Sequence, residues 1–332
     1  MRTLTIICLM AISSISLAET VNIYSFRQPF LIEPILESFT QETGIKTKVI
    51  FAKEGLIQRI KREGKLSPAD IILTSDFSKL LQLKDESLTQ AYPQNSSVNS
   101  NVPVQFRDNE RHWVALTKRV RNIYSSKARL GKLDISYEDL ANEKYKGKIC
   151  TRSGKHPYNL GLIASLITHN GEAETKAWLM AVKNNLARKP QGNDRAQVKA
   201  IKEGLCDLSL GNSYYLGKML NDEKQIPWAN AVELNFPNQN NRGSHINVSG
   251  AAIAKFAPNK KAAQTLLDFL TTEKAQSLYA ELNMEYPVRI GVAPSKLVSS
   301  WGTFKEDDIS LVDVAANIKT ALKLTDQTKF DL

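Results

Sequence analysis

Histidine and cysteine, which bind most of the zinc and copper in proteins, are scarce in this 332-residue sequence. It contains four histidines and three cysteines, and no two of the cysteines form a Cys-x-x-Cys pair. This composition argues against a zinc or copper site. The sequence also lacks a phosphate-binding glycine-rich loop, a Ser-His-Asp arrangement and a plausible pair of catalytic carboxylates. We therefore expect that the protein is not an enzyme.

Acidic residues are fewer than basic ones, with 34 Asp and Glu against 44 Lys and Arg. The basic residues are scattered and interleaved with acids, as in Lys61-Arg62-Glu63, and they form no stripe with aromatic residues. This pattern argues against a nucleic-acid partner. A positive surface of this kind favours an anionic ligand instead.

Apolar runs of about 20 residues, the length that spans a membrane, are also missing. The short run at residues 4–12 follows Arg2 and precedes Ser16-Leu17-Ala18, which is typical of a secretory signal peptide. We predict that residues 1–18 form this signal, that cleavage follows Ala18, and that the mature protein is exported. Removal of the signal leaves Cys150 and Cys206. In an oxidising compartment this pair predicts a disulfide, and the alternative is two small buried residues at strand ends.

Strand-like and helix-like patterns alternate along the chain, which is typical of an α/β fold with open, mostly parallel sheets. Strands are predicted at residues 21–24, 46–51, 69–74, 122–125, 148–151, 206–210 and 246–254, and helices at residues 33–42, 53–64, 159–168, 175–185, 194–203 and 258–271. The polar stretch 95–103 predicts a surface loop.

Two α/β series of this kind predict two lobes with a cleft between them. We expect two crossings, near residues 113–117 and 243–247. The N-terminal lobe would comprise residues 19–116 and 244–293, and the C-terminal lobe residues 117–243 and 294–332. Ligands of open α/β sheets bind beyond the carboxyl ends of the strands.

Polar side chains follow three of the predicted strands. Tyr214 and Tyr215 come after the strand at 206–210, and Tyr158 comes after the strand at 148–151. Arg27 and Gln28 follow the first strand. A single tyrosine at such a place is usually a half-buried packing residue, and Arg27 could equally form a surface charge or an interlobe salt bridge. Three tyrosines at equivalent strand ends favour a binding site.

Several longer strings resemble the periplasmic ferric-ion-binding proteins of bacterial ABC importers, and the similarity covers essentially all of the mature chain. The strings are Tyr24-Ser25-Phe26-Arg27-Gln28, Leu66-Ser67-Pro68-Ala69-Asp70, Leu116-Thr117-Lys118-Arg119, Gly192-Asn193-Asp194-Arg195, Gly211-Asn212-Ser213-Tyr214-Tyr215, His245-Ile246-Asn247-Val248-Ser249-Gly250 and Glu285-Tyr286-Pro287-Val288. The paired tyrosines in their Gly-Asn-Ser setting are the most specific of these. The resemblance implies a two-lobed periplasmic binding protein of type II.

The resemblance also implies a set of ligands. Tyr214 and Tyr215 match the paired iron ligands of the family, and Tyr158 matches a third tyrosine that a subset uses. Where many members have a histidine after the first strand, this sequence has Gln28-Pro29, which implies no protein ligand from the first lobe. Carbonate or bicarbonate would then complete the coordination of Fe³⁺. The expected anion-binding residues are Arg27, Gln28, Arg119 and Arg152, unless these arginines pair with acidic residues instead.

As a member of this family, the protein would capture ferric iron in the periplasm as a monomer. It would deliver the iron to an inner-membrane ABC permease and its ATPase. Three phenolates would balance the charge of Fe³⁺, a hard cation that prefers oxygen donors. The alternative is a protein that binds a small organic or inorganic anion without metal, with the tyrosines as walls of the site.

Overall fold

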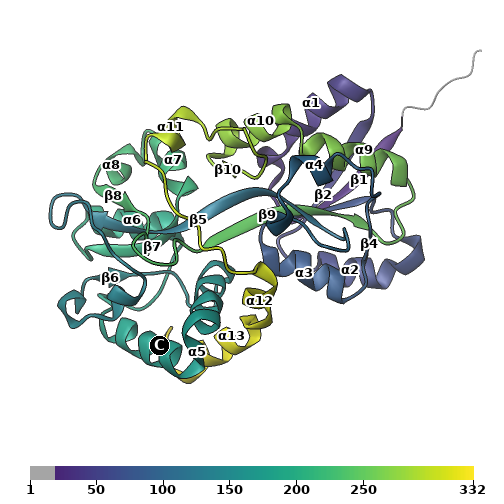
Figure 1. The fold of residues 1–332 in the computed structure, drawn as a ribbon. Coiled ribbons are helices and arrows are strands. Elements are labelled where there is room, and N and C mark those ends of the chain that lie inside the picture. Colours follow the sequence, from purple (N-terminus) through teal and green to yellow (C-terminus); the bar gives the residue numbers. More distant parts are fainter. Residues whose placement is uncertain (1–18) are drawn as a thin grey trace, which may run out of the picture.

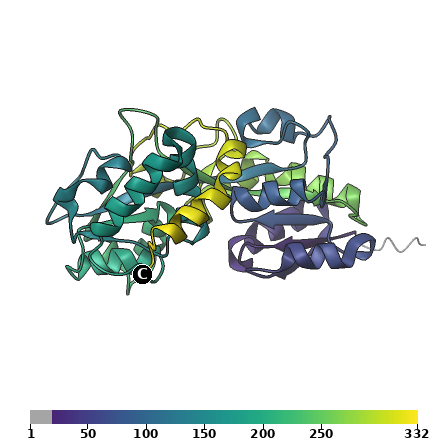
Figure 2. The ribbon, with the colours of Figure 1, turned by 90° about the horizontal axis from the view of Figure 1, so that it is seen from below.

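The computed structural model describes residues 19–332, so the predicted signal peptide and its cleavage site lie outside the described part of the chain. Figures 1 and 2 show two α/β bodies side by side, joined by the long strands β5 (Val114–Ser126) and β9 (Ile246–Ala254). Within residues 19–332, no helix has both the length and the apolar character needed to span a membrane.

The first sheet lies in the body that contains the N-terminal part of the chain. β1 (Thr20–Ser25) pairs in parallel with β2 (Lys46–Phe51) and with β3 (Ile71–Thr74), and β9 pairs antiparallel with β3. The short strands β4 (Thr89–Gln90) and β10 (Tyr286–Pro287) pair with β9 and β5. The accompanying helices are α1 (Glu33–Thr43), α2 (Leu56–Glu63), α3 (Phe77–Asp85), α4 (Val98–Asn101), α9 (Lys260–Leu270) and α10 (Glu273–Asn283).

The second sheet is built on the other half of β5. β7 (Leu208–Asn212) and β8 (Val232–Asn235) pair antiparallel with it, and β6 (Ile149–Cys150) pairs in parallel with β7. The helices of this body are α5 (Pro157–Asn184), α6 (Asp194–Lys202), α7 (Tyr214–Leu220), α8 (Ile226–Ala229), α11 (Lys296–Ser299), α12 (Leu311–Ala316) and α13 (Ile318–Gln327). α12 and α13 pack on α5, and α12 also reaches α3 in the first body (Figure 2).

A single strand, β5, therefore belongs to both sheets. From Val114 to Val120 it pairs with β9, and from Arg121 onward it pairs with β7 and β8. The sequence predicted only its last part, because Lys118, Arg119 and Arg121 interrupt the apolar pattern. These three cations are accommodated by partners from distant segments: Glu306, the Ser75 carbonyl and Asp194 respectively.

A third stretch of chain also links the bodies within residues 19–332, where the sequence predicted two crossings. After β10 the chain leads to α11, which contacts α7. It then passes Ser244, whose backbone N–H donates to the Lys305 carbonyl at 2.9 Å. Ser244 also forms an isolated parallel bridge with Glu306. The start of β9 is thus held by β5 on one side and by the segment with Lys305 and Glu306 on the other.

Most predicted elements are confirmed, and one is wrong. The single helix α5 contains a break at Gly171, where φ is 84°, which matches the two helices predicted there. Residues 95–103 do not form a purely exposed loop, because they contain α4 and the buried Val98. Ser96 donates to Asp268 at 2.6 Å, so the polar side chains that suggested a loop attach this segment to α9.

The predicted disulfide between Cys150 and Cys206 is confirmed, with the two Cα atoms 5.9 Å apart. Both residues are buried, and the bond joins the end of β6 to the segment that enters β7. It closes a loop across a sequence separation of 56 residues. In the chain-entropy account, such a closure restricts the unfolded state.

Removing this disulfide should destabilise the protein. We expect the double variant Cys150→Ser, Cys206→Ser to lose about 2–5 kcal/mol in the free energy of unfolding, because the unfolded chain gains freedom. Urea denaturation of the oxidised proteins measures the change, and the reduced wild-type protein is the control. A loss below about 1 kcal/mol would contradict a stabilising role.

Candidate functional site

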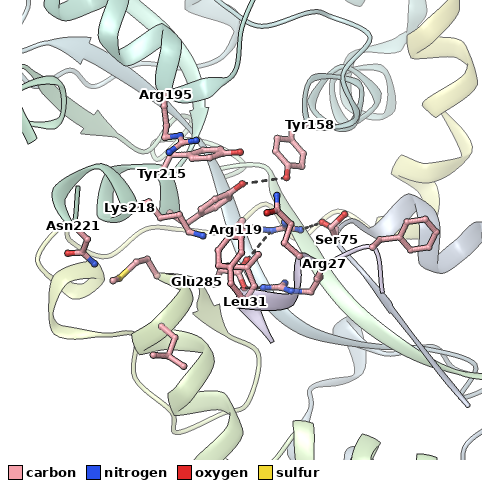
Figure 3. A pocket seen from close by; sticks show the side chains of 16 residues that line it. Arg27, Leu31, Ser75, Arg119, Tyr158, Arg195, Tyr215, Lys218, Asn221 and Glu285 are labelled. Carbon is pink, nitrogen blue, oxygen red and sulfur yellow. Dashed lines mark hydrogen bonds and ion pairs between the residues drawn. The ribbon is translucent and has the colours of Figure 1, made fainter. Parts of the chain in front are cut away.

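A pocket of about 660 Å³ opens between the two bodies, where the carboxyl ends of strands from both sheets meet (Figure 3). It is lined by Phe26, Arg27, Gln28, Phe30, Leu31, Ser75, Arg119, Tyr158, Arg195, Tyr214, Tyr215, Lys218, Asn221, Leu282, Met284 and Glu285. Six of the seven residues predicted as site residues are in this wall. The seventh, Arg152, is not among its lining residues.

The three predicted tyrosines lie together because β6 and β7 are parallel neighbours. Tyr158 is the second residue of α5, which follows β6, and Tyr214 and Tyr215 begin α7, which follows β7. The hydroxyl oxygens of Tyr158 and Tyr214 are 3.4 Å apart, and the ring centroids of Tyr214 and Tyr215 are 4.2 Å apart. Since the carboxyl ends of parallel strands share an edge of the sheet, three phenol groups line one wall of the pocket.

A buried ion pair joins the two segments that carry these tyrosines. Nη1 of Arg121, on β5, donates to Oδ2 of Asp194 at 2.7 Å. Nη2 of Arg121 donates to Oδ1 of Asn159, the neighbour of Tyr158, at 2.6 Å. Asp194 also accepts from the backbone N–H of Asn212, at the end of β7, at 2.9 Å. One guanidinium and one carboxylate thus fix the first turn of α5 relative to the end of β7.

Arg152 shares Asp194 with Arg121 and lies beside Tyr158. Its Nη1 is 3.0 Å from Oδ1 of Asp194, and its Cζ is 5.3 Å from the centroid of the Tyr158 ring. The sequence left open whether Arg152 holds an anion or pairs with an acidic residue, and the structure shows the ion pair. Arg152 therefore places positive charge beside Tyr158 without entering the pocket wall.

Arg27 and Arg119 converge on one carboxylate, that of Glu285. Nη2 of Arg27 donates to Glu285 at 2.9 Å, and Nε of Arg119 lies 4.0 Å from it. Arg119 also donates to the carbonyl of Ser75. Burial alone would raise the pKa of Glu285, but the two arginines hold it below its usual range. Together, the two arginines and Glu285 keep one net positive charge. Nε and Nη1 of buried Arg27 have no hydrogen-bond partner among the described residues.

The hydroxyls of Tyr214 and Tyr215 remain protonated in the absence of a ligand. Burial raises the pKa of Tyr215 to about 12, and Tyr158 and Asp194 contribute to the rise. Burial also raises the pKa of Tyr214 well above its usual range, with further contributions from Tyr158 and Tyr215, and Arg119 opposes the rise. A ligand that needs phenolates must therefore displace protons from these side chains.

Five polar residues of the pocket wall were not predicted as site residues: Ser75, Arg195, Lys218, Asn221 and Glu285. Arg195 and Glu285 do lie in strings that the sequence singled out. Lys218 follows Tyr214 by four residues, so helical spacing could have placed it on the same face of α7. Among residues 19–332, no group of three or more His, Cys, Asp and Glu side chains is arranged to hold a metal.

The chain resembles known proteins over nearly its whole length. The family model described as bacterial extracellular solute-binding protein matches residues 67–302. Iron uptake protein A1 of Synechocystis sp. (strain ATCC 27184 / PCC 6803 / Kazusa) is 40% identical over 313 residues, which cover 93% of this chain and 87% of that protein.

Two solved structures share both fold and sequence with it. The apo ferric ion-binding protein A of Pasteurella haemolytica is 55% identical, with a TM-score of 0.90 over 95% of this chain and 99% of that one. Trichodesmium IdiA (FutA), in complex with iron and citrate ligands, is 36% identical, with a TM-score of 0.89 over 94% and 99% of the two chains.

The carboxylate of Asp194 should be essential for stability. Burial by itself raises its pKa, but Arg121, Arg152 and the Asn212 amide lower it below the usual range. We expect Asp194→Asn to cost about 3–5 kcal/mol at neutral pH, because it leaves buried guanidinium charge without a carboxylate.

This contribution is present above the pKa of an unfolded aspartate and is lost as the pH falls through the lower folded value. The difference between wild type and variant should therefore shrink in strong acid. Urea unfolding over a range of pH measures it. Glu203→Gln, which removes an exposed partner of Lys199, is the control, with an expected change below about 1 kcal/mol. An equal effect of the two substitutions would contradict the special role of Asp194.

Proposed function

The chain belongs to the bacterial extracellular solute-binding proteins, and we propose that it binds ferric iron through the phenolate oxygens of Tyr158, Tyr214 and Tyr215. The observation that carries this proposal is the convergence of three tyrosines from two neighbouring strand ends on one pocket wall. Members of this family are transport components that bind solutes, and they are not enzymes. The iron is thus cargo, to be held and released unchanged.

Phenolate oxygen suits this cargo. Fe³⁺ is a hard cation, and three phenolates cancel its three charges. Because Tyr214 and Tyr215 are protonated in the free protein, iron binding releases protons and weakens on acidification. Arg119 and Arg152, whose Cζ atoms lie 5.8 Å and 5.3 Å from the ring centroid of Tyr158, place positive charge beside the tyrosine wall.

An exogenous oxyanion completes the coordination in this proposal. Three phenolates fill half of the six positions that octahedral coordination offers, and a bidentate carbonate or bicarbonate can occupy two more. Arg27 and Arg119 are the first candidates to hold it, since buried N–H groups of Arg27 lack partners among the described residues. Gln28, which is exposed in the pocket wall, would assist, and Arg152 would contribute positive charge beside Tyr158.

We place this function in the periplasm and assign delivery of the iron to an inner-membrane ABC permease with its ATPase. Relatives named as iron uptake and ferric iron-binding proteins, including the Fe(3+)-binding periplasmic protein of Serratia marcescens, support this assignment. The Serratia marcescens protein is 26% identical over 92% of this chain.

Two lobes that can close on the cargo are part of the proposal. The N-terminal lobe comprises residues 19–116 and 244–293, and the C-terminal lobe comprises residues 117–243 and 294–332. β5 changes its strand partner from β9 to β7 between Val120 and Arg121, which supports a hinge at these residues. Pocket residues come from both sides of it: Arg27 and Glu285 from one lobe, and the tyrosines from the other. Closure of such lobes around a ligand is a common motion.

Removal of single phenol oxygens tests the iron site. Mixed with a ferric salt and bicarbonate, the wild-type protein should develop a visible phenolate-to-iron charge-transfer band. Tyr214→Phe and Tyr215→Phe should each abolish or strongly shift the band and weaken binding by roughly a hundredfold or more, since even indirect changes around metal ligands cost 10- to 100-fold. Tyr158→Phe should weaken binding to a smaller extent.

The matched control is Tyr92→Phe, which removes a buried hydroxyl outside the pocket wall. Absorption spectroscopy with iron titration, checked by circular dichroism for intact folding, provides the readout. A wild-type protein that stays colourless, or Tyr214 and Tyr215 variants that bind iron as tightly as wild type, would refute the tyrosine site.

The oxyanion is tested by supplying it separately. In carbonate-depleted buffer the wild-type protein should bind iron weakly, and addition of bicarbonate should restore affinity and shift the visible band. Arg27→Ala should blunt this response, because it removes N–H donors to the anion. Equal affinity and identical spectra with and without bicarbonate would show that carbonate is not required.

A further inference from the structure

Met284 and Gly217 are unusual residues for the backbone positions that they occupy. Met284, in the pocket wall, follows the last residue of α10 in a left-handed conformation, with φ 58° and ψ 29°. Glycine is the usual residue at such a helix end, because a side chain is disfavoured there. Gly217 is buried inside α7, where glycine is less favourable than alanine. Each backbone position thus holds the type of residue that would suit the other position better.

The two residues are in direct contact. A Cβ atom added to Gly217 would lie 2.7 Å from Cγ, 3.1 Å from Cβ and 3.4 Å from Sδ of Met284. Carbon atoms in good contact are about 3.5–4.0 Å apart. Cβ and Cγ form the base of the methionine side chain, which cannot swing away as its far end could. Met284 therefore occupies the space that a side chain at position 217 would need.

This contact joins the two bodies of the protein. Met284 ends α10 of the first body and immediately precedes Glu285, the carboxylate that holds two arginines of the pocket. Gly217 belongs to α7 of the second body. Oγ of Ser295, just before α11, donates to Sδ of Met284 at 4.0 Å. The methionine side chain is thus fixed at its base by Gly217 and at its sulfur by Ser295.

The contact lies close to the tyrosines along α7. Residues three and four apart share one face of a helix, so Gly217 and Lys218 lie on the same face as Tyr214. Lys218 also approaches the first body, because its ammonium lies 5.1 Å from the ring centroid of Phe30. α7 thus carries two of the proposed iron ligands at its start and contacts the other body one turn later.

Simple packing does not account for this choice of residues. A glycine at position 284 and a larger residue at position 217 could fill the same space without a left-handed side-chain residue and without a glycine inside a helix. A residue with a side chain persists in the left-handed region only where the surrounding structure requires it, and such residues often lie at functional sites. The present arrangement places the projecting side chain on the first body and the recess on the helix of the tyrosines. The helix is therefore seated only when the two bodies are together.

We propose that Met284 is a positioning residue of the iron site, because its side chain seats α7 at Gly217 and thereby fixes Tyr214 and Tyr215. This proposal rests on the proposed function, since it assumes iron bound by these tyrosines. The three tyrosines of the pocket wall all belong to the second body. Through Met284 the first body acts on their geometry without supplying a ligand. Separation of the two bodies then removes the seat of α7 and favours release of the iron.

The experiment is a double-mutant cycle, with the visible phenolate-to-iron band and the iron affinity as readouts. Gly217→Ala should shift the band and weaken iron binding by about tenfold or more, since the new Cβ collides with Met284. Met284→Gly removes the seat and should weaken binding by about three- to tenfold. In the Met284→Gly background, Gly217→Ala should cost less than about twofold, because the three atoms nearest to the new Cβ are gone.

Stability separates positioning from a merely structural role. The urea midpoint of Met284→Gly should stay near that of wild type, since glycine relieves the left-handed backbone while the side-chain contact is lost. The matched control is Ser87→Gly, which relieves the same conformation, with φ 53°, after α3 at an exposed position outside the pocket wall. This control should bind iron and show the band as wild type does. Small-angle scattering of the iron-loaded proteins should show Gly217→Ala more extended than wild type.

Two results would overturn the role of Met284: equal costs of Gly217→Ala in both backgrounds, or wild-type affinity and an unchanged band in Met284→Gly. If Gly217→Ala does not fold, the comparison of Met284→Gly with Ser87→Gly decides alone. A wild-type protein that shows no band would refute the iron site itself, and with it any role of Met284 there.

Discussion

The buried cluster of Arg121, Asp194 and Arg152 is the interaction on which the rest of the site depends. Asp194 is completely buried, and it accepts from two guanidinium groups and from the backbone at the end of β7. Buried ion pairs contribute little net stability compared with an apolar core, but they are strongly directional. Here the direction matters, because the cluster connects the two helix starts that carry Tyr158 and Tyr214. A shift in either segment would separate phenol oxygens that now lie 3.4 Å apart.

The pocket combines two kinds of positive charge. Arg27 and Arg119 are fixed by Glu285 and by the carbonyl of Ser75, so their positions are set before any ligand arrives. Arg195 and Lys218 lack such restraints within the described chain and can follow the shape of a ligand. Rigid donors favour selectivity, because their side chains are already ordered before the ligand binds. Adjustable donors favour tolerance of different anions. In the site that we propose, the wall of tyrosines binds the metal, and the charges around it bind the anion that accompanies the metal.

Much of this arrangement could be predicted from the sequence, since it depends on local patterns. Buried strands such as β3 and β9 are short apolar runs, and Tyr158, Tyr214 and Tyr215 follow strands that the pattern identified. The length of β5 was underestimated because its charged side chains find partners far away in the chain, which periodicity cannot reveal. The same reason explains Glu285, which was not predicted as a site residue and which the fold places between Arg27 and Arg119. Segment 95–103 was misjudged because Ser96 and Ser97 donate hydrogen bonds to Asp268 of α9, a distant residue that the local pattern does not reveal.

The position of β9 between β3 and β5 also determines when the first sheet can be completed. β1, β2 and β3 are formed from residues 20–74, yet their central neighbour consists of residues 246–254. Pairing of β3 with β9 must close a long loop, and such non-local contacts form slowly. When the N-terminus of the chain emerges first, the strand that completes the first sheet is therefore missing until about three-quarters of the chain is available. Under the export to the periplasm that we propose, this order of assembly delays compaction of the chain until its C-terminal part is available.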